Sequence, residues 1–230
     1  MKRLIMLVVL MVISTFMLVG CGGGGGGSSS TPTPTGTAVS MATFKGLFYG
    51  TATPGTQISF PLSGSDSLGN SWTGSFAIVS DGPTTFESQN VTKSRVLVTL
   101  QIGAGAPVSG ITSYYYLTSN STLYKSVSSF GTIYVPTTQT VIPDTIHVGD
   151  FDNFENTTNS DGTTDSTIWR LEADYNGNTK FTLSTIERTG ATITYTEEDT
   201  LYLDPSGNPY RLEVKLTESG ITLTMSGNRT

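Results

Sequence analysis

Strict alternation of apolar and polar residues constrains the carboxyl-terminal part of the chain most strongly. Between Trp169 and Tyr175 every second residue has an apolar body, and Arg170, Glu172 and Asp174 stand in between. A period of two residues is that of a β-strand with one face toward a core and one toward water. We find no stretch of ten or more residues with helical periodicity, so the sequence predicts an all-β fold.

Turn residues separate the alternating segments. Asn176-Gly177 is a strong hairpin signal, and Asp204–Asn208 forms the next turn. Residues 167–225 are therefore predicted to form an antiparallel meander of about six strands with one apolar face. Upstream segments, from Phe44–Tyr49 to Thr132–Val135, are expected to cover that face. They would form a sandwich with the meander, or the whole would curl into a barrel or open clam.

Residues 41–230 are long enough for one domain that buries about 70% of its unfolded surface. We expect a single all-β domain. The least regular segment is 137–164, and a division into two subdomains there is the alternative.

The amino-terminal 20 residues have the layout of an export signal. Lys2 and Arg3 come first, an apolar run spans 4–19, and the small residue Gly20 ends it. We expect residues 1–20 to be a signal peptide that is removed from the mature chain.

Residues Leu18-Val19-Gly20-Cys21 resemble the lipobox of bacterial lipoproteins. The resemblance covers the first 21 residues only. It implies that Cys21 carries a diacylglycerol and becomes the first mature residue, with a further fatty acid such as palmitate on its amino group. Gly22 stands where an aspartate would favour retention in the inner membrane, so the resemblance implies the outer membrane if the organism is Gram-negative.

Residues 21–40 are predicted to be the lipidated cysteine and a disordered tether of glycine, serine, threonine and proline. With a flexible-chain reach of roughly 22 to 26 Å, this tether would leave the domain beside the membrane but free to turn. Cys21 is the only cysteine, so no disulfide within the chain is expected.

The charge balance argues against nucleic acid as a partner. The chain has 12 basic and 18 acidic residues, and loss of Lys2 and Arg3 with the signal leaves 10 basic ones. Such an acidic surface repels phosphate backbones. The expected partners are the membrane, through acyl chains on Cys21, and a protein or saccharide that the sequence does not identify.

An acidic segment is a candidate calcium site. Its carboxylates, Asp150, Asp152, Glu155, Asp161 and Asp165, are interleaved with asparagines, and oxygen ligands suit calcium. The spacing does not match the helix-flanked calcium loop, so we expect a solvated acidic loop, with calcium as the alternative. No other cofactor is expected.

Other candidate sites rest on single features. Tyr114 and Tyr116 would share one face of a strand and could bind a ligand, whereas Tyr115 would face the other side. Glu197-Glu198-Asp199 is interpreted as a charged turn. His147, the only histidine, lies near acids, but no Gly-x-Ser-x-Gly motif accompanies it, so no catalytic residue is assigned.

Three functions remain open from the sequence. The first is a lipid-anchored envelope lipoprotein with a noncatalytic β domain for binding or a structural role. The second is a carrier of lipid or another hydrophobic ligand in an open β clam, against which the lack of a helical lid counts. The third is a hydrolase of the cell envelope, which would need a cleft with His147 or two carboxylates of strongly perturbed pKa.

Overall fold

The computed structural model describes residues 36–230. The predicted signal peptide, the lipidation site Cys21 and most of the tether lie outside the described residues. Among the residues described, no helix is both long and apolar enough to cross a membrane.

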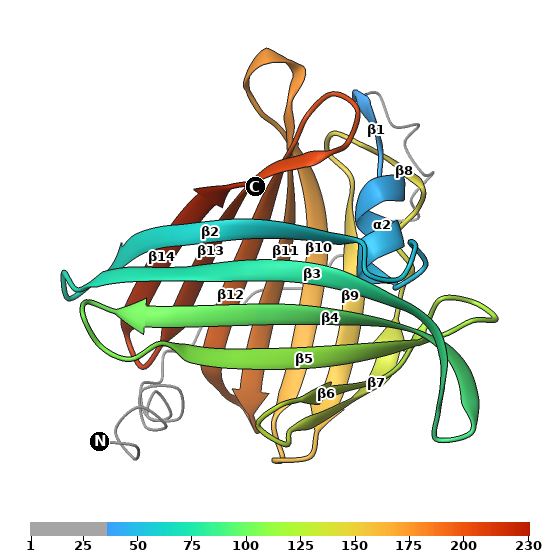
Figure 1. Ribbon diagram of the computed structural model, residues 1–230, viewed down its shortest axis with the longest axis horizontal. Coiled ribbons are helices and arrows are strands. Elements are labelled where there is room, and N and C mark those ends of the chain that lie inside the picture. The colour runs from blue at the N-terminus through green and yellow to red at the C-terminus, as the bar shows by residue number, and fades with distance from the viewer. Residues whose placement is uncertain (1–35) are drawn as a thin grey trace, which may run out of the picture.

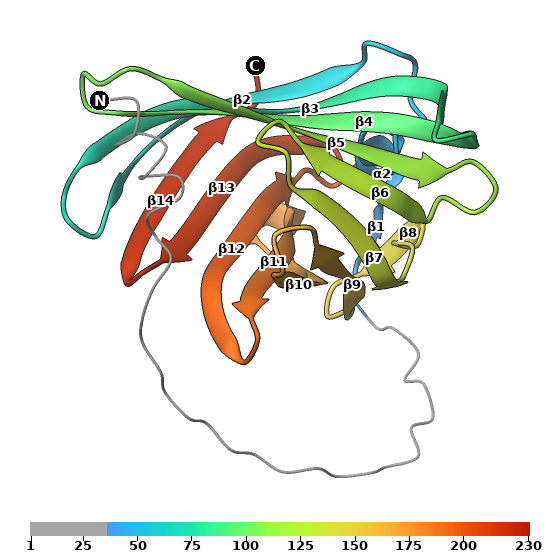
Figure 2. The ribbon, with the colours of Figure 1, turned by 90° about the horizontal axis from the view of Figure 1, so that it is seen from below.

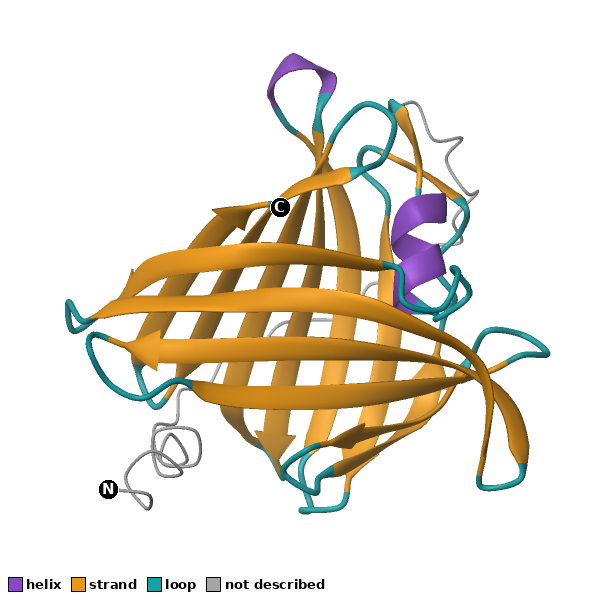
Figure 3. Cartoon of the chain, viewed as in Figure 1, coloured by secondary structure: helices purple, strands orange, loops and turns teal. Residues whose placement is uncertain are grey.

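Twelve antiparallel strands form one closed barrel (Figures 1 and 3). Around the barrel their order is β10-β11-β12-β13-β14-β2-β3-β4-β5-β6-β7-β9, and β9 pairs with β10 to close it. The prediction of an all-β fold is confirmed, with the barrel as the architecture. The strands are β2 (Gln57–Asp66), β3 (Ser71–Phe86), β4 (Gln89–Ile102), β5 (Val108–Leu117), β6 (Leu123–Ser128), β7 (Ile133–Gln139), β9 (Phe151–Asn159), β10 (Thr164–Ala173), β11 (Thr179–Thr189), β12 (Thr192–Leu203), β13 (Pro209–Glu218) and β14 (Ile221–Asn228).

The carboxyl-terminal meander contains five strands, β10 to β14, rather than about six. Residues on either side of Glu197-Glu198-Asp199 belong to one strand of 12 residues, β12. The charged turn predicted there was therefore wrong. Acidic residues usually mark turns, but these three continue the alternation of β12 without a break.

A short helix, α2 (Ala42–Phe48), lies within one end of the barrel. Figure 1 shows it at the upper right, beside a two-stranded sheet of β1 (Ala38–Ser40) and β8 (Thr145–His147). A 3-10 turn, η1 (Tyr175–Gly177), joins β10 to β11. The strand predicted for 44–49 was wrong, because Phe44, Leu47 and Phe48 lie three and four residues apart and share the buried face of the helix.

The end that contains α2, here called the helix end, is a packed apolar core. Phe44 lies 5.1 Å from Phe181 between ring centroids, and Phe48 lies 5.7 Å from Phe154. Around the barrel, pairing sets Leu171, Phe181, Leu201 and Leu212 in one row, and all four are buried.

The opposite end of the barrel, here called the hairpin end, is formed by six tight connections. They join β2–β3, β4–β5, β6–β7, β9–β10, β11–β12 and β13–β14. In Figure 2, seen from below, the hairpins β11–β12 and β13–β14 project away from α2. Neighbouring strands run antiparallel, so residues that pair across adjacent strands lie at similar distances from the turns of the hairpin end. The interior of the barrel between this core and the hairpin end, here called the lumen, contains polar side chains.

Candidate functional site

Carboxyl groups gather inside the barrel, on the strands opposite β3 and β4. Pairing places Asp165 on β10 opposite Glu187 on β11, Glu187 opposite Tyr195 on β12, and Tyr195 opposite Glu218 on β13. Paired residues share a face of a sheet. Tyr195 also shares its face with Leu201 and Leu203 of the core, because these positions differ by even numbers, so the whole row faces inward.

Two further rows lie between this first row and the core. One contains Glu155, Thr167, Thr185 and Glu197 on β9 to β12. The next contains Asp199, which pairs with Leu183 and Val214. We call the six inward carboxyl residues of these rows the acidic wall: Glu155, Asp165, Glu187, Glu197, Asp199 and Glu218.

The acidic wall has no basic side chain paired with it among residues 36–230. Arg170 and Lys215 form ion pairs with Glu198, whose side chain lies on the outer face between Glu197 and Asp199, and Arg170 also pairs with Glu172. The other ion pairs in this part of the chain also leave the six acidic-wall residues out. The negative charge of the wall is therefore uncompensated when its groups ionise.

Burial raises the pKa of several of these carboxyl groups. It raises the pKa of Glu155 to about 8, with the charge of Asp165 adding to the effect. Burial likewise raises the pKa of Asp165 to about 6 and that of Glu218 to about 7, with Glu187 contributing to both. Glu197 and Asp199 also have raised pKa values, first through burial and then through neighbouring acidic charges. A buried carboxyl group is more stable when it is protonated or paired with a cation than when it is ionised without a partner.

Tyrosines complete the polar part of the lumen. Tyr195 donates a hydrogen bond of 2.9 Å from its hydroxyl to Oε2 of Glu197. Tyr114, on β5, lies across the lumen, where burial and then the charges of Glu155 and Glu197 raise its pKa. The phenol of Tyr114 thus faces the acidic wall.

Several buried polar atoms have no hydrogen-bond partner within the described part of the chain. Three belong to donors in buried side chains: the hydroxyl of Tyr116, whose residue is 0% exposed, Nε1 of Trp169, whose residue is 3% exposed, and the hydroxyl of Thr179, whose residue is 2% exposed and lies at the helix end. Three acceptor atoms belong to the acidic wall, namely Oε2 of Glu155, Oδ1 of Asp165 and Oδ1 of Asp199. Leaving such groups unpaired costs about 1–3 kcal/mol each, so the three unpaired oxygens of the acidic wall point to a missing partner.

Part of the barrel interior keeps solvent-accessible surface. Leu183 and Leu216 face inward by their pairing with Asp199 and Glu197, yet they are only partly buried. Val96, Val98 and Leu100 on β4 also face inward and are only partly buried. Inward side chains keep accessible surface only if the barrel interior has space at their level. Val96, Val98 and Leu100 lie about half way around the barrel from β10 and β11, so they form an apolar wall opposite the acidic wall.

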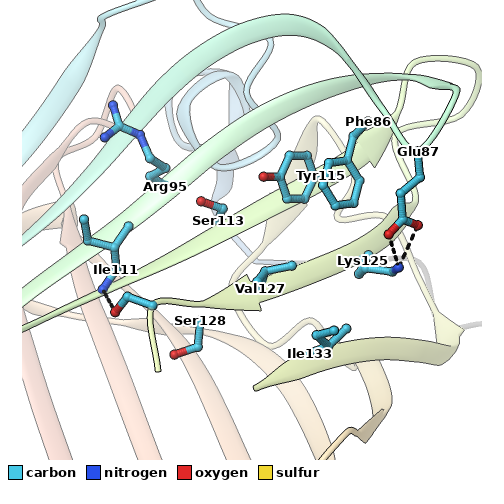
Figure 4. A pocket seen from close by; sticks show the side chains of 11 residues that line it. Phe86, Glu87, Arg95, Ile111, Ser113, Tyr115, Lys125, Val127, Ser128 and Ile133 are labelled. Atoms are coloured by element: carbon cyan, nitrogen blue, oxygen red, sulfur yellow. Dashed lines mark hydrogen bonds and ion pairs between the residues drawn. The ribbon is translucent and has the colours of Figure 1, made fainter. Parts of the chain in front are cut away.

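A separate groove of about 540 Å³ lies on the outer face of β4 to β7 (Figure 4). Tyr115 and Phe86 line it and stack on each other, with ring centroids 3.8 Å apart. Lys93 lies over the Tyr115 ring and Lys125 over the Phe86 ring. Because each ring is already covered by a neighbouring ring and a cation, this groove lacks a free aromatic platform.

The two tyrosines predicted to bind a ligand point into the barrel. Tyr114 reaches the lumen, whereas Tyr116 packs against Tyr49 of the core, with ring centroids 5.0 Å apart. The inference that Tyr115 faces the other side agrees with its place in the outer groove. Ligand binding by Tyr114 and Tyr116 stays a prediction.

The five candidate calcium ligands lie in different places. Glu155 and Asp165 belong to the acidic wall, Asp150 accepts a hydrogen bond from the His147 backbone, Asp152 is exposed, and Asp161 accepts from Thr163 in a turn. Within residues 36–230, no three His, Cys, Asp or Glu side chains form a group that could hold a metal ion.

His147 lies on β8 at the helix end, outside the lumen. Its Nδ1 is 3.5 Å from Oδ2 of Asp150. None of the hydrogen bonds found in residues 36–230 joins its imidazole to a serine or threonine hydroxyl. The described part of the chain therefore shows a histidine and carboxylate without a nucleophile beside them.

No protein-family model matches the chain, and no curated protein sequence matches it significantly. The site must be interpreted from its own chemistry.

Glu187, Glu197, Asp199 and Glu218 were missed as site residues by the sequence reasoning. A signal was present, because Tyr195, Glu197 and Asp199 continue the inward positions of Leu201 and Leu203. Carboxylates on the apolar face of a strand are unusual enough to mark a site.

Proposed function

We propose that this protein is a lipid-anchored, noncatalytic binding protein whose barrel takes up a small molecule with an apolar part. The observation that carries the proposal is the lumen itself, where partly buried Leu183 and Leu216 adjoin unpaired polar groups of the acidic wall. A mostly apolar space with a few converging polar groups is the usual form of a small-molecule site.

The hairpin end provides a suitable entrance. A large exposed apolar residue lies in or beside five of its six hairpins, namely Leu68, Ile102, Phe130, Ile193 and Ile221. Exposed apolar side chains around an opening favour contact with an apolar molecule or surface. The hydrophobic carrier that the sequence left as an alternative gains support from this rim and from α2, which closes the other end.

Titration with the neutral fluorescent amine N-phenyl-1-naphthylamine tests the binding function. A saturable fluorescence increase with one probe per chain is expected. Leu183→Trp should weaken binding by about tenfold or more, because a larger side chain fills lumen space. Ile186→Trp on the outer face of the same strand is the matched control and should leave binding unchanged. Absence of saturable binding, or equal loss in both variants, would count against a lumen site.

The anchor requires its own test, because it rests on the resemblance of residues 18–21 to a lipobox. Cys21→Ser should release the protein from the membrane fraction and abolish labelling by radioactive palmitate. Unchanged membrane retention in the variant, or no labelling of the native protein, would refute the anchoring proposal.

A further inference from the structure

We infer that the lumen binds an organic cation, an amine or quaternary ammonium compound with an apolar tail. This inference rests on the proposed binding function and names its ligand class. It combines three features of the lumen: the acidic wall, buried polar groups that lack partners, and the apolar wall opposite.

The acidic wall supplies a charge that only a cation can balance. Six carboxyl residues from five consecutive strands face one space, while the lysines and arginines that form ion pairs do so on the outside of the barrel or at its helix end. Glu198 shows the contrast on one strand, because its outward carboxylate contacts Arg170 and Lys215. Neighbouring Glu197 and Asp199 face inward without a cation.

The unpaired polar atoms independently indicate a missing ligand. The Tyr116 side chain is completely buried, its hydroxyl has no partner, and the charge of nearby Glu155 contributes to the rise in its pKa. Oε2 of Glu155 and Oδ1 of Asp199 also lack donors. A protonated amine donates N–H bonds to carboxylate oxygens, so a ligand headgroup of this kind could supply the donors that these two carboxyl groups lack.

Tyr114 adds an aromatic surface to the same place. It lies across the lumen from Glu155, Glu197 and Asp199; burial raises its pKa most, and the charges of these three groups add to the rise. Its ring stacks at 6.4 Å from that of Tyr116. A cation within about 6 Å of an aromatic ring is attracted by the electrons of its face, and quaternary ammonium groups are commonly held in this way.

The apolar wall indicates the other part of the ligand. Val96, Val98 and Leu100 line the lumen on β4, and Phe76 and Trp72 follow on β3. Because β4 lies about half way around the barrel from β11, a molecule between the walls would meet carboxylates on one side and hydrocarbon on the other. An amphiphilic cation fits this division.

The spacing of the carboxylates disfavours a small metal ion. Glu197 and Asp199 are two residues apart on one strand, which separates their backbones by about 6.6 Å. Calcium needs ligand oxygens within about 2.3–2.6 Å of one point. The described acids form no such group, whereas a diffuse ammonium headgroup can contact carboxylates several ångströms apart.

Three probes with the same eight-carbon tail test the inference by calorimetry: octyltrimethylammonium, octyl glucoside and octyl sulfate, all as monomers. The parent protein is the full chain with Cys21→Ser, at pH 8, where more of the carboxyl groups are ionised. Octyltrimethylammonium should bind about tenfold more tightly than octyl glucoside, with octyl sulfate weakest, because the acidic wall attracts the first and repels the last.

The double variant Glu197→Gln, Asp199→Asn should lose most of this preference while retaining octyl glucoside binding. Glu198→Gln, on the outer face between them, is the matched control and should keep the preference. Equal affinity for the three probes in the parent protein would refute the cation inference and leave lumen binding intact. If no probe binds, including N-phenyl-1-naphthylamine, the proposed function fails as well. The parent comparison decides the question even if the double variant does not fold.

Discussion

The hydroxyl of Tyr195 donates a 2.9 Å hydrogen bond to Oε2 of Glu197, two residues further along the same strand. Both side chains face the lumen, in a region where Glu187 and Glu218 pair with Tyr195. This is the one hydrogen bond made by the Glu197 carboxylate within residues 36–230, and it lowers the pKa that burial raises.

Tyr195→Phe should therefore destabilise the barrel most when Glu197 is ionised. Loss of one hydrogen bond to a charged group should lower the free energy of unfolding by about 1.5–3 kcal/mol. Urea titrations at pH 8 and pH 5 measure the effect, which should be smaller at pH 5. Tyr175→Phe, at a side chain that is 84% exposed in the turn between β10 and β11, is the control. A variant as stable as the parent at pH 8 would show that the bond contributes nothing.

The stability of the barrel should fall as the pH rises from 5 to 8. Glu155, Glu218 and Asp165 have folded-state pKa values of about 8, 7 and 6, above their values of 4.5, 4.5 and 3.8 in the unfolded chain. Between the two pKa values of each group the folded state binds more protons, so stability is greatest below the unfolded pKa and is lost up to the folded one.

Thermal melts across this range should show a melting temperature several degrees lower at pH 8 than at pH 5. Glu155→Gln should flatten the dependence, because it removes the group with the widest titration window of the three. Glu198→Gln on the outer face should leave the slope unchanged. A melting temperature that rises toward pH 8 would contradict the raised pKa values.

Val214→Asp should unfold the barrel, whereas Lys215→Gln should have little effect. Val214 is 7% exposed and pairs with Asp199, so the substitution places a second carboxylate directly opposite the first. A buried unpaired charge costs more than about 4 kcal/mol, whereas loss of the exposed Lys215 changes stability by about 0.5 kcal/mol or less. Circular dichroism during urea unfolding measures both. Similar values would mean that the inward and outward faces of β13 are assigned incorrectly.

Calcium at millimolar concentration should hardly change the melting temperature. Ligand binding to the folded state alone would add about 2.7 kcal/mol at a concentration a hundredfold above the dissociation constant. The candidate ligands Asp150, Asp152 and Asp161 have separate local contacts, which favours the small shift. A rise of several degrees that Asp152→Asn abolishes would instead establish calcium binding by the acidic loop. A rise abolished by Glu197→Gln would place a metal in the lumen.

Much of the strand pattern was predictable because it depends on neighbouring residues. The alternation around Trp169 and Val214, and the turn at Asn176-Gly177, lead to β10, β11 and β13. Side-chain direction alternates along any strand, so the facing of Tyr114 and Tyr115 also followed from the sequence alone. The helix α2 was missed because seven residues are too few to show a clear helical period.

The sequence by itself determined the β class and which side chains share a face, because both follow from the local geometry of the backbone. Only the tertiary structure decided that the sheet closes into a barrel, since closure depends on the pairing of the last strand, β14, with β2 near the start of the domain. It also decided that Glu155, Glu197 and Asp199 meet Tyr114 in one lumen. These residues lie on three strands far apart in the chain, and their shared environment arises from long-range pairing and burial that no local pattern records.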